Sequence, residues 1–190
     1  MLNQHKGRSR DEESAGALLA RAGERFGDRP YLSFALDESA LSFAEAAESA
    51  RHVAGGLARL GVDRGDRVLL MLRNRVELVL GWLGAASLGA VQVPVNVDYR
   101  GTFLEHVVRT SGARLLVVEA ELLDAVVASL PRLPGLETVV LVGEQRPVPG
   151  ARVVPFAELL EATPAAPREA RAADPAAIHF TSGTSGGSKG

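Results

Sequence analysis

The chain has 190 residues, of which 46% are hydrophobic and 23% are charged, and its formal net charge is −2. These proportions are typical of a folded soluble protein and exclude the disordered class. A net charge so close to zero favours neither a nucleic acid nor an anionic membrane as a partner. The absence of cysteine excludes a disulfide framework, a thiolate zinc site and a cysteine nucleophile. It is compatible with the cytoplasm, where we expect the protein to work.

Residues 1–13 are expected to form a flexible, solvated tail, because charged side chains of both signs occur there without an apolar stretch. That composition argues against a secretory signal. The twenty residues 78–97 carry no charge and are long enough to span a membrane. Glycines, a proline and an asparagine interrupt them, so we interpret the stretch as a helix that feeds a buried strand. We therefore expect no membrane span.

Helical spacing of apolar residues predicts several helices. We place them at residues 14–26, 43–60, 76–90, 102–111 and 121–130. The second helix carries the clearest end signals. Ser42 precedes it with Glu45 three positions later, which is a capping-box pattern, and Gly61 follows it where a left-handed cap favours glycine.

Short stretches rich in valine and leucine predict strands at 67–72, 91–95, 114–118 and 138–142. They are apolar on successive residues, as expected for parallel strands covered by helices on both faces. A small hairpin is expected from 31–36 and 40–43. We therefore predict an α/β subdomain over 14–161, with a mostly parallel sheet flanked by helices.

Residues 162–175 contain three prolines among alanines and charged residues. Because proline at this density breaks helices and weakens strands, we interpret the segment as a linker or surface crossing. A further short strand is expected over 176–181. The remaining residues of 176–190 are interpreted as the start of a phosphate-binding loop, truncated by the end of the chain.

The last ten residues carry the chemistry. They are Thr181, Ser182, Gly183, Thr184, Ser185, Gly186, Gly187, Ser188, Lys189 and Gly190. Glycines allow consecutive backbone N–H groups to turn toward an anion. The hydroxyl groups add donors for phosphate oxygens, and the lysine adds a positive charge. These residues therefore predict a site for a polyphosphate.

Two readings compete with this one. A flexible Gly/Ser linker or an engineered scar would explain the composition, but the loop follows an apolar stretch and repeats no simple unit. The nucleoside-triphosphate P-loop pattern fits poorly. When Gly183 is aligned with its first glycine, Ser188 replaces the second glycine and Gly190 replaces the magnesium-binding hydroxyl residue. We keep the P-loop as a second choice.

Residues 180–190 resemble the signature of the adenylate-forming superfamily, which includes acyl- and aryl-CoA ligases, luciferases and peptide-synthetase adenylation domains. The family pattern T-S-G-T-T-G-x-P-K-G is met here with Ser185 in place of threonine and Ser188 in place of proline. Further resemblance to acyl-CoA ligases covers much of the chain. It is carried by Leu41–Ala47, Gly61–Leu72, Gly89–Arg100 and Gly112–Val118.

The resemblance implies an ATP-dependent acid:CoA ligase, with Mg²⁺ as cofactor, a small carboxylic acid as substrate and CoA as acceptor. The ten loop residues would lie over the ATP β- and γ-phosphates. We expect the chain to be an N-terminal fragment that needs the remainder of its polypeptide, and to be inactive alone. No residue within it is expected to bind a metal or to act as a catalyst beyond the loop. A homodimer is left open.

Three alternatives remain open. A relative within the superfamily would use ATP to activate nitrite for diazotisation. A P-loop nucleotide-binding module would need a Ser or Thr directly after Lys189. A non-enzymatic α/β interaction domain would carry no ligase motif in any continuation.

Overall fold

The structure, a computed structural model, describes residues 14–35, 39–168 and 174–181. The expected tail at 1–13 lies outside these residues. Within the described part, five parallel strands form one sheet in the order β4-β3-β5-β6-β7. They are β3 (Arg67–Met71), β4 (Val91–Pro94), β5 (Leu115–Glu119), β6 (Thr138–Val142) and β7 (Arg152–Pro155). The prediction of a mostly parallel α/β sheet is confirmed.

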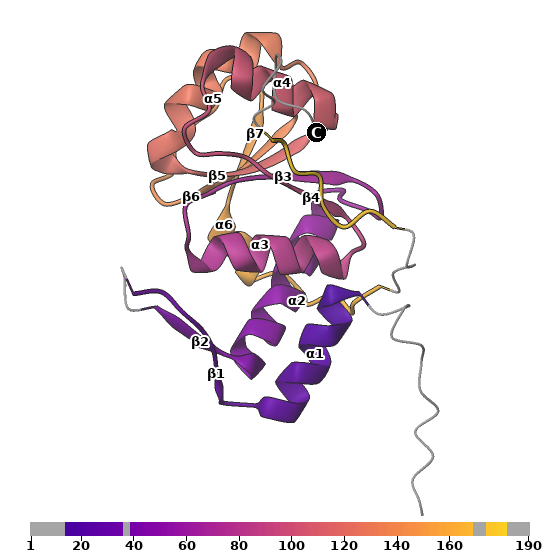
Figure 1. Cartoon of the computed structure of the whole chain (residues 1–190). Coiled ribbons are helices and arrows are strands. Elements are labelled where there is room, and N and C mark those ends of the chain that lie inside the picture. Colours follow the sequence, from indigo (N-terminus) through magenta and orange to yellow (C-terminus); the bar gives the residue numbers. More distant parts are fainter. Residues whose placement is uncertain (1–13, 36–38, 169–173, 182–190) are drawn as a thin grey trace, which may run out of the picture.

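Helices cover both faces of this sheet (Figure 1). One face carries α4 (Gly101–Ser111) and α5 (Leu123–Ser129), and the other carries α2 (Phe43–Arg59), α3 (Val76–Ser87) and α6 (Phe156–Leu160). Short 3-10 turns at Ala120–Leu122 and Leu130–Arg132 flank α5. None of the helices in the described ranges is long and apolar enough to cross a membrane.

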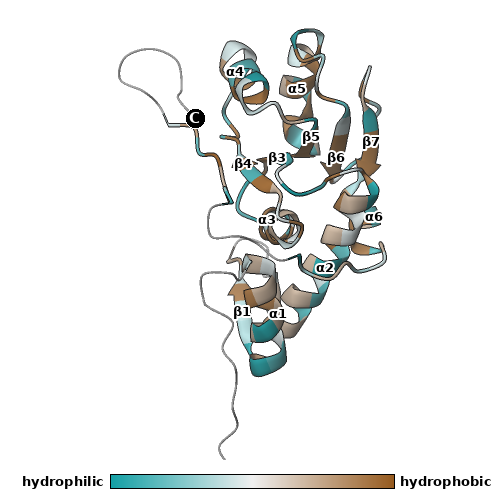
Figure 2. Ribbon diagram, turned by 90° about the vertical axis from the view of Figure 1, so that its right-hand side faces the viewer, coloured by the Kyte–Doolittle hydropathy of each residue, from teal (hydrophilic) through white to brown (hydrophobic). Residues whose placement is uncertain are grey.

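The core lies on both sides of the sheet, because successive side chains of a strand point to opposite faces. Leu69 and Met71 belong to the cluster that contains residues of α4 and α5. Val68 and Leu70 belong to the cluster that contains residues of α2 and α3. All four side chains are buried, and Figure 2 shows hydrophobic residues gathered along the strands. Because helices cover both faces of the sheet, apolar residues occupy successive positions of β3.

A further layer packs outside α2 and α3 (Figure 1). It consists of α1 (Ala15–Phe26) and the antiparallel hairpin of β1 (Pro30–Ser33) and β2 (Ala40–Ser42). The ring centroid of Phe43 lies 5.0 Å from that of Phe26 and 4.8 Å from that of Tyr31. These aromatic contacts attach the layer to the start of α2, and the predicted hairpin is confirmed.

The ends of α2 follow the sequence signals closely. Ser42 is the N-cap, its hydroxyl accepts the Glu45 N–H, and the Glu45 carboxylate accepts the Ser42 N–H at 2.8 Å. The hydrogen bonds that the carboxylate accepts from the Ser42 backbone N–H and from the Ser42 hydroxyl lower the pKa of the Glu45 carboxyl group. The predicted capping box is confirmed.

Two predicted helices have wrong limits. The helix expected over 76–90 ends at Ser87, because Gly89 takes a φ of +71° and Ala90 N–H bonds back to Ala85 in a turn. The helix expected over 121–130 is an α-helix only at 123–129, between two 3-10 turns. In the first case a local glycine cap ends a helix that the apolar pattern alone would allow to continue.

Strand β7 was not predicted from the sequence. Its four residues end in a proline, which cannot donate to a sheet ladder and so weakens a strand signal. In the structure β7 pairs with β6 alone, so Pro155 sits at a sheet edge, where proline is tolerated.

Close packing of α3 on α2 depends on Gly84. A Cβ at Gly84 would lie 2.6 Å from Val53 Cγ1 and 3.1 Å from the Ala54 backbone nitrogen. Gly84→Ala is therefore expected to lower the free energy of unfolding by about 1–3 kcal/mol, because neither atom can yield without moving α2. Urea unfolding followed by circular dichroism measures the change.

The same helix supplies a matched control at Gly81. There, a Cβ would meet Leu70 Cδ2 at 3.2 Å, and that is the mobile end of a side chain. Alanine also favours a helix over glycine by about 1 kcal/mol. Gly81→Ala should thus stay within about 1 kcal/mol of the unchanged protein, and equal stability of the two variants would contradict the packing argument.

Candidate functional site

The order of the strands places a topological switch point at the carboxyl edge of the sheet. The chain passes from β3 to β4 on one side, and then returns past β3 to β5 on the other. In open parallel sheets, ligands bind outside the carboxyl ends of the strands where the direction of winding reverses. The ends of β3, β4 and β5 are therefore the place to look for a site.

Residues 174–181 run beside β4 toward this edge. The backbone N–H of Gln92 donates to Ala176 O at 3.1 Å, and the N–H of Ile178 donates to Gln92 O at 2.9 Å. The strand predicted over 176–181 is not formed as such; in its place the structure has a parallel bridge between Gln92 and Ala177 and a further bridge residue at Thr181.

This segment delivers Thr181 to the carboxyl side of β4. Ile178 and Phe180 pack against the hydrophobic cluster beneath α4, and the Phe180 ring meets the edge of His106 with centroids 5.9 Å apart. Thr181 itself is exposed. The other predicted loop residues, Ser182 to Gly190, lie outside the described residues, so their contact with phosphate stays a prediction.

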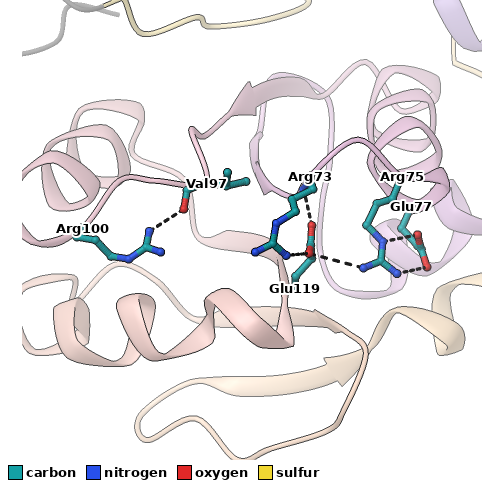
Figure 3. A network of polar contacts seen from close by, with 6 residues as sticks. All are labelled: Arg73, Arg75, Glu77, Val97, Arg100 and Glu119. Atoms are coloured by element: carbon teal, nitrogen blue, oxygen red, sulfur yellow. Dashed lines mark hydrogen bonds and ion pairs between the residues drawn. The ribbon is translucent and has the colours of Figure 1, made fainter. Parts of the chain in front are cut away.

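A network of charged side chains joins the ends of β3 and β5 (Figure 3). The Glu119 side chain is 3% exposed, and one of its oxygens lies 2.7 Å from Arg73 Nη1 and 3.8 Å from Arg75 Nη1. Its other oxygen accepts the backbone N–H of Arg73. Glu119 therefore satisfies its buried charge through groups that follow β3.

Arg75 also forms a two-point contact with Glu77, with distances of 2.7 Å and 3.1 Å. This hydrogen bonding raises the pKa of the Arg75 guanidinium further. Beside the network, Arg100 donates to the carbonyls of Val97 and Tyr99 at 2.6 Å and 2.8 Å, and it closes the turn after β4. At this edge, Arg73 and Arg75 thus connect the end of β3 to Glu119 at the end of β5.

Sequence reasoning missed this network. A signal was present, because Glu119 directly follows the buried run predicted at 114–118, and Arg73 directly follows the run predicted at 67–72. Charged residues immediately after two neighbouring parallel strands meet at the same edge. Which strands are neighbours, however, depends on the order of the sheet.

The described part of the chain contains no group of three or more His, Asp or Glu side chains that could hold a metal ion. The Mg²⁺ that the resemblance implies thus has no cluster of ligands among residues 14–35, 39–168 and 174–181. We assign no step to it here.

Comparison with known proteins extends over nearly the whole chain. The sequence matches the family model described as AMP-binding enzyme over residues 19–190. It is 34% identical over 169 residues to 4-coumarate-CoA ligase 1 of Narcissus pseudonarcissus, and 34% identical over 183 residues to medium/long-chain-fatty-acid–CoA ligase FadD6 of Mycobacterium tuberculosis. These matches cover 87% and 94% of this chain but only 30% and 29% of the relatives.

Solved structures give a similar result. The fold resembles an anthranilate CoA ligase, AuaEII, in complex with anthranoyl-AMP, with a TM-score of 0.85 and 25% sequence identity. It also resembles a putative long-chain-fatty-acid CoA ligase from Rhodopseudomonas palustris, with a TM-score of 0.79 and 26% identity. The matches cover 95% and 91% of this chain, and 34% and 42% of the structures compared.

Proposed function

This chain belongs to the family of AMP-binding enzymes, and from this premise we propose that it works within an ATP-dependent acid:CoA ligase. The observation that carries the proposal is the continuous family match over 19–190, which runs through the glycine-rich residues 181–190. Relatives of several origins are CoA ligases for aromatic or fatty acids. The shared chemistry is activation of a carboxylic acid, and we leave the identity of the acid open.

The proposed reaction has two steps. In the first, an oxygen of the substrate carboxylate attacks the α-phosphorus of ATP. The bond from this phosphorus to the bridging oxygen breaks, and pyrophosphate leaves with the electron pair. In the second step, the sulfur of CoA attacks the acyl carbon, its proton is lost, and AMP leaves as the thioester forms. This chain supplies positioning and charge for the first step.

The loop residues Thr181 to Gly190 would hold the β- and γ-phosphates. Backbone N–H groups of the glycines would face the phosphate oxygens, with the hydroxyls as further donors and Lys189 as a positive charge against the departing pyrophosphate. Support comes from the position of Thr181, which lies at the carboxyl side of β4, where open α/β sheets bind ligands. The position of Thr181 in the fold therefore supports a ligand-binding role for the loop.

The relatives are more than three times as long as their matched segments. We propose that the activity needs a protein of that length, and that the 190-residue chain by itself neither forms an acyl-adenylate nor binds ATP tightly. We further propose a cytoplasmic protein that acts on a small carboxylic acid, with Mg²⁺ and CoA, and without a nucleic acid or membrane partner. The division of the chain into a tail, a subdomain, a linker and a loop also stays a prediction.

Acid-dependent exchange of labelled pyrophosphate into ATP tests this function. A protein that continues this sequence to the length of its relatives should exchange label only when a suitable carboxylic acid is supplied, and should then form a thioester with CoA. The 190-residue chain should give no exchange above background.

Nitrite with an aryl amine is the matched alternative substrate in the same assay. Consumption of ATP with nitrite but with none of a panel of aromatic and fatty acids would replace the ligase by a nitrite-activating relative. Clear exchange by the 190-residue chain would refute the need for a longer protein.

A further inference from the structure

The segment that leads to the loop follows a long path over the protein surface. After α6 it lies along α2, where the Ala165 N–H donates to Arg51 O at 2.9 Å and His52 Nδ1 lies 2.6 Å from Ala162 O. It then passes α3, where the Arg168 N–H donates to Ser87 O at 2.7 Å. Residues 174–181 bring it to β4. Side chains of the turn at residues 61–66 contact this segment at two residues, Arg168 and Asp174.

That turn, residues 61–66, connects α2 to β3 and is braced from within. Asp66 Oδ2 accepts the Asp63 N–H at 2.8 Å, and Asp63 Oδ1 accepts the Arg64 N–H at 2.6 Å. The Gly65 N–H donates to Gly89 O at 2.9 Å, which joins the turn to the start of β4. Its side chains therefore project from a backbone held by hydrogen bonds on both sides.

The turn presents two neighbouring and opposite charges to the segment. Asp63 forms an ion pair with Arg168, and Arg64 forms an ion pair with Asp174, residues 105 and 110 positions away in the sequence. The hydrogen bond from the Arg64 backbone and the contact with Arg168 lower the pKa of the Asp63 carboxyl group. Each charged side chain of the turn thus contacts a side chain of opposite charge on the segment.

We propose that Arg64, through its ion pair with Asp174, is a positioning residue that sets where residues 176–181 lie along β4, and that Asp63 holds the preceding stretch through Arg168. The inference rests on the proposed function. The segment contacts β4 through the hydrogen bonds at Gln92 and packs Ile178 and Phe180 against the hydrophobic cluster, and the ion pair of Asp174 adds a charge contact at its start. Arg64 and Asp63 act through the segment and are not assigned contact with ATP.

We expect the two ion pairs to affect the position of the segment more than the stability of the whole protein. The Arg64–Asp174 side chains are 38% and 27% exposed, and the Arg168–Asp63 side chains are 44% and 71% exposed. Exposed pairs contribute little to overall stability. A segment displaced along β4 would carry Asp174 away from Arg64, however, and would lose that ion pair. The proposal therefore predicts a local effect without global unfolding.

Hydrogen exchange of the Ile178 and Gln92 amides in the 190-residue chain tests this positioning. Arg64→Asp and Asp174→Arg should each speed exchange about three- to tenfold at these amides, since an attraction is replaced by repulsion. The double variant R64D/D174R restores opposite charges and should return exchange to within about twofold of the unchanged chain. Asp63→Asn keeps the turn acceptor but removes the charge, and should speed exchange less.

Asp124 and Arg146 offer a matched control, as an exposed ion pair at 3.1 Å between α5 and the loop that follows β6. Asp124→Arg should leave exchange at Ile178 and Gln92 unchanged. Unchanged exchange in both R64D and D174R, or no recovery in the double variant, would overturn the proposal.

The effect on catalysis is measured in a protein that continues this sequence to the length of its relatives. R64D and D174R should raise the KM for ATP about three- to tenfold while kcat at saturating ATP stays within about twofold, and the double variant should recover both. An equal loss of kcat without a change in KM would contradict a positioning role. Absence of any acid-dependent turnover in the unchanged protein would overturn the proposed ligase function, while the exchange measurements would still decide whether the turn positions the segment.

Discussion

Replacing Lys189 with alanine is expected to lower acid-dependent ATP–pyrophosphate exchange about 100- to 1,000-fold in a protein of the relatives' length, the range seen when one preorganised donor to a developing charge is removed. Negative charge builds on the departing pyrophosphate, and Lys189 is the one lysine in the glycine-rich loop. Initial rates at saturating acid and ATP measure the effect.

The chain contains its own control for this experiment. Its only other lysine is Lys6, and Lys6→Ala removes the same charge from the expected tail and should leave the rate within about twofold. Lys189→Arg should recover only part of the activity, because a planar guanidinium does not replace a compact ammonium in a tight loop. Equal rates for K189A and K6A would refute the phosphate-binding role of the loop.

Truncating Glu119 to alanine is expected to lower the free energy of unfolding by about 2–3 kcal/mol. The carboxylate is buried and accepts both the backbone N–H and the guanidinium of Arg73. Its loss would leave the backbone group without its partner and would separate the ends of β3 and β5. The Arg73 side chain is 55% exposed, so water can solvate its charge, which keeps the cost below that of a fully buried pair.

Glu121 is the matched control, because it is the same residue type two positions later and is exposed. Glu121→Ala should change stability by less than about 0.5 kcal/mol. Glu119→Gln keeps an acceptor for the Arg73 N–H and should fall between the two. Urea unfolding followed by the fluorescence of Trp82 distinguishes these outcomes, and an E119A variant as stable as E121A would rule out the proposed role of the network.

The elements that the sequence predicted well share one property, which is that their signals are local. The four predicted strands of the sheet appear within one residue of their expected limits, because runs of buried apolar residues are visible in any short window. The capping box at Ser42 and Glu45 spans three positions. By contrast, β7 is a short edge strand ending in Pro155, and no local pattern distinguishes such a strand from a loop.

In the candidate site, too, the local features could be predicted from the sequence and the long-range contacts could not. The phosphate-binding role predicted for residues 181–190 rests on residue type alone, and the family match extends through them. Glu119 and Arg73 could not be paired from the sequence, since they are 46 positions apart and meet only if β3 and β5 are neighbours. A different strand order would place the same residues at separate edges.

The sequence by itself determined the fold class and the helix cap, and it predicted a phosphate-binding role for the last ten residues, since each depends on side chains within one helix turn, strand or loop. Only the tertiary structure decided the order of the sheet, the partner of Glu119, and the meeting of the turn at 61–66 with Arg168 and Asp174. The physical reason is that hydrogen bonds and ion pairs act over a few ångströms. Which distant residues come that close is set by how the helices cross over the sheet, and no local pattern encodes that path.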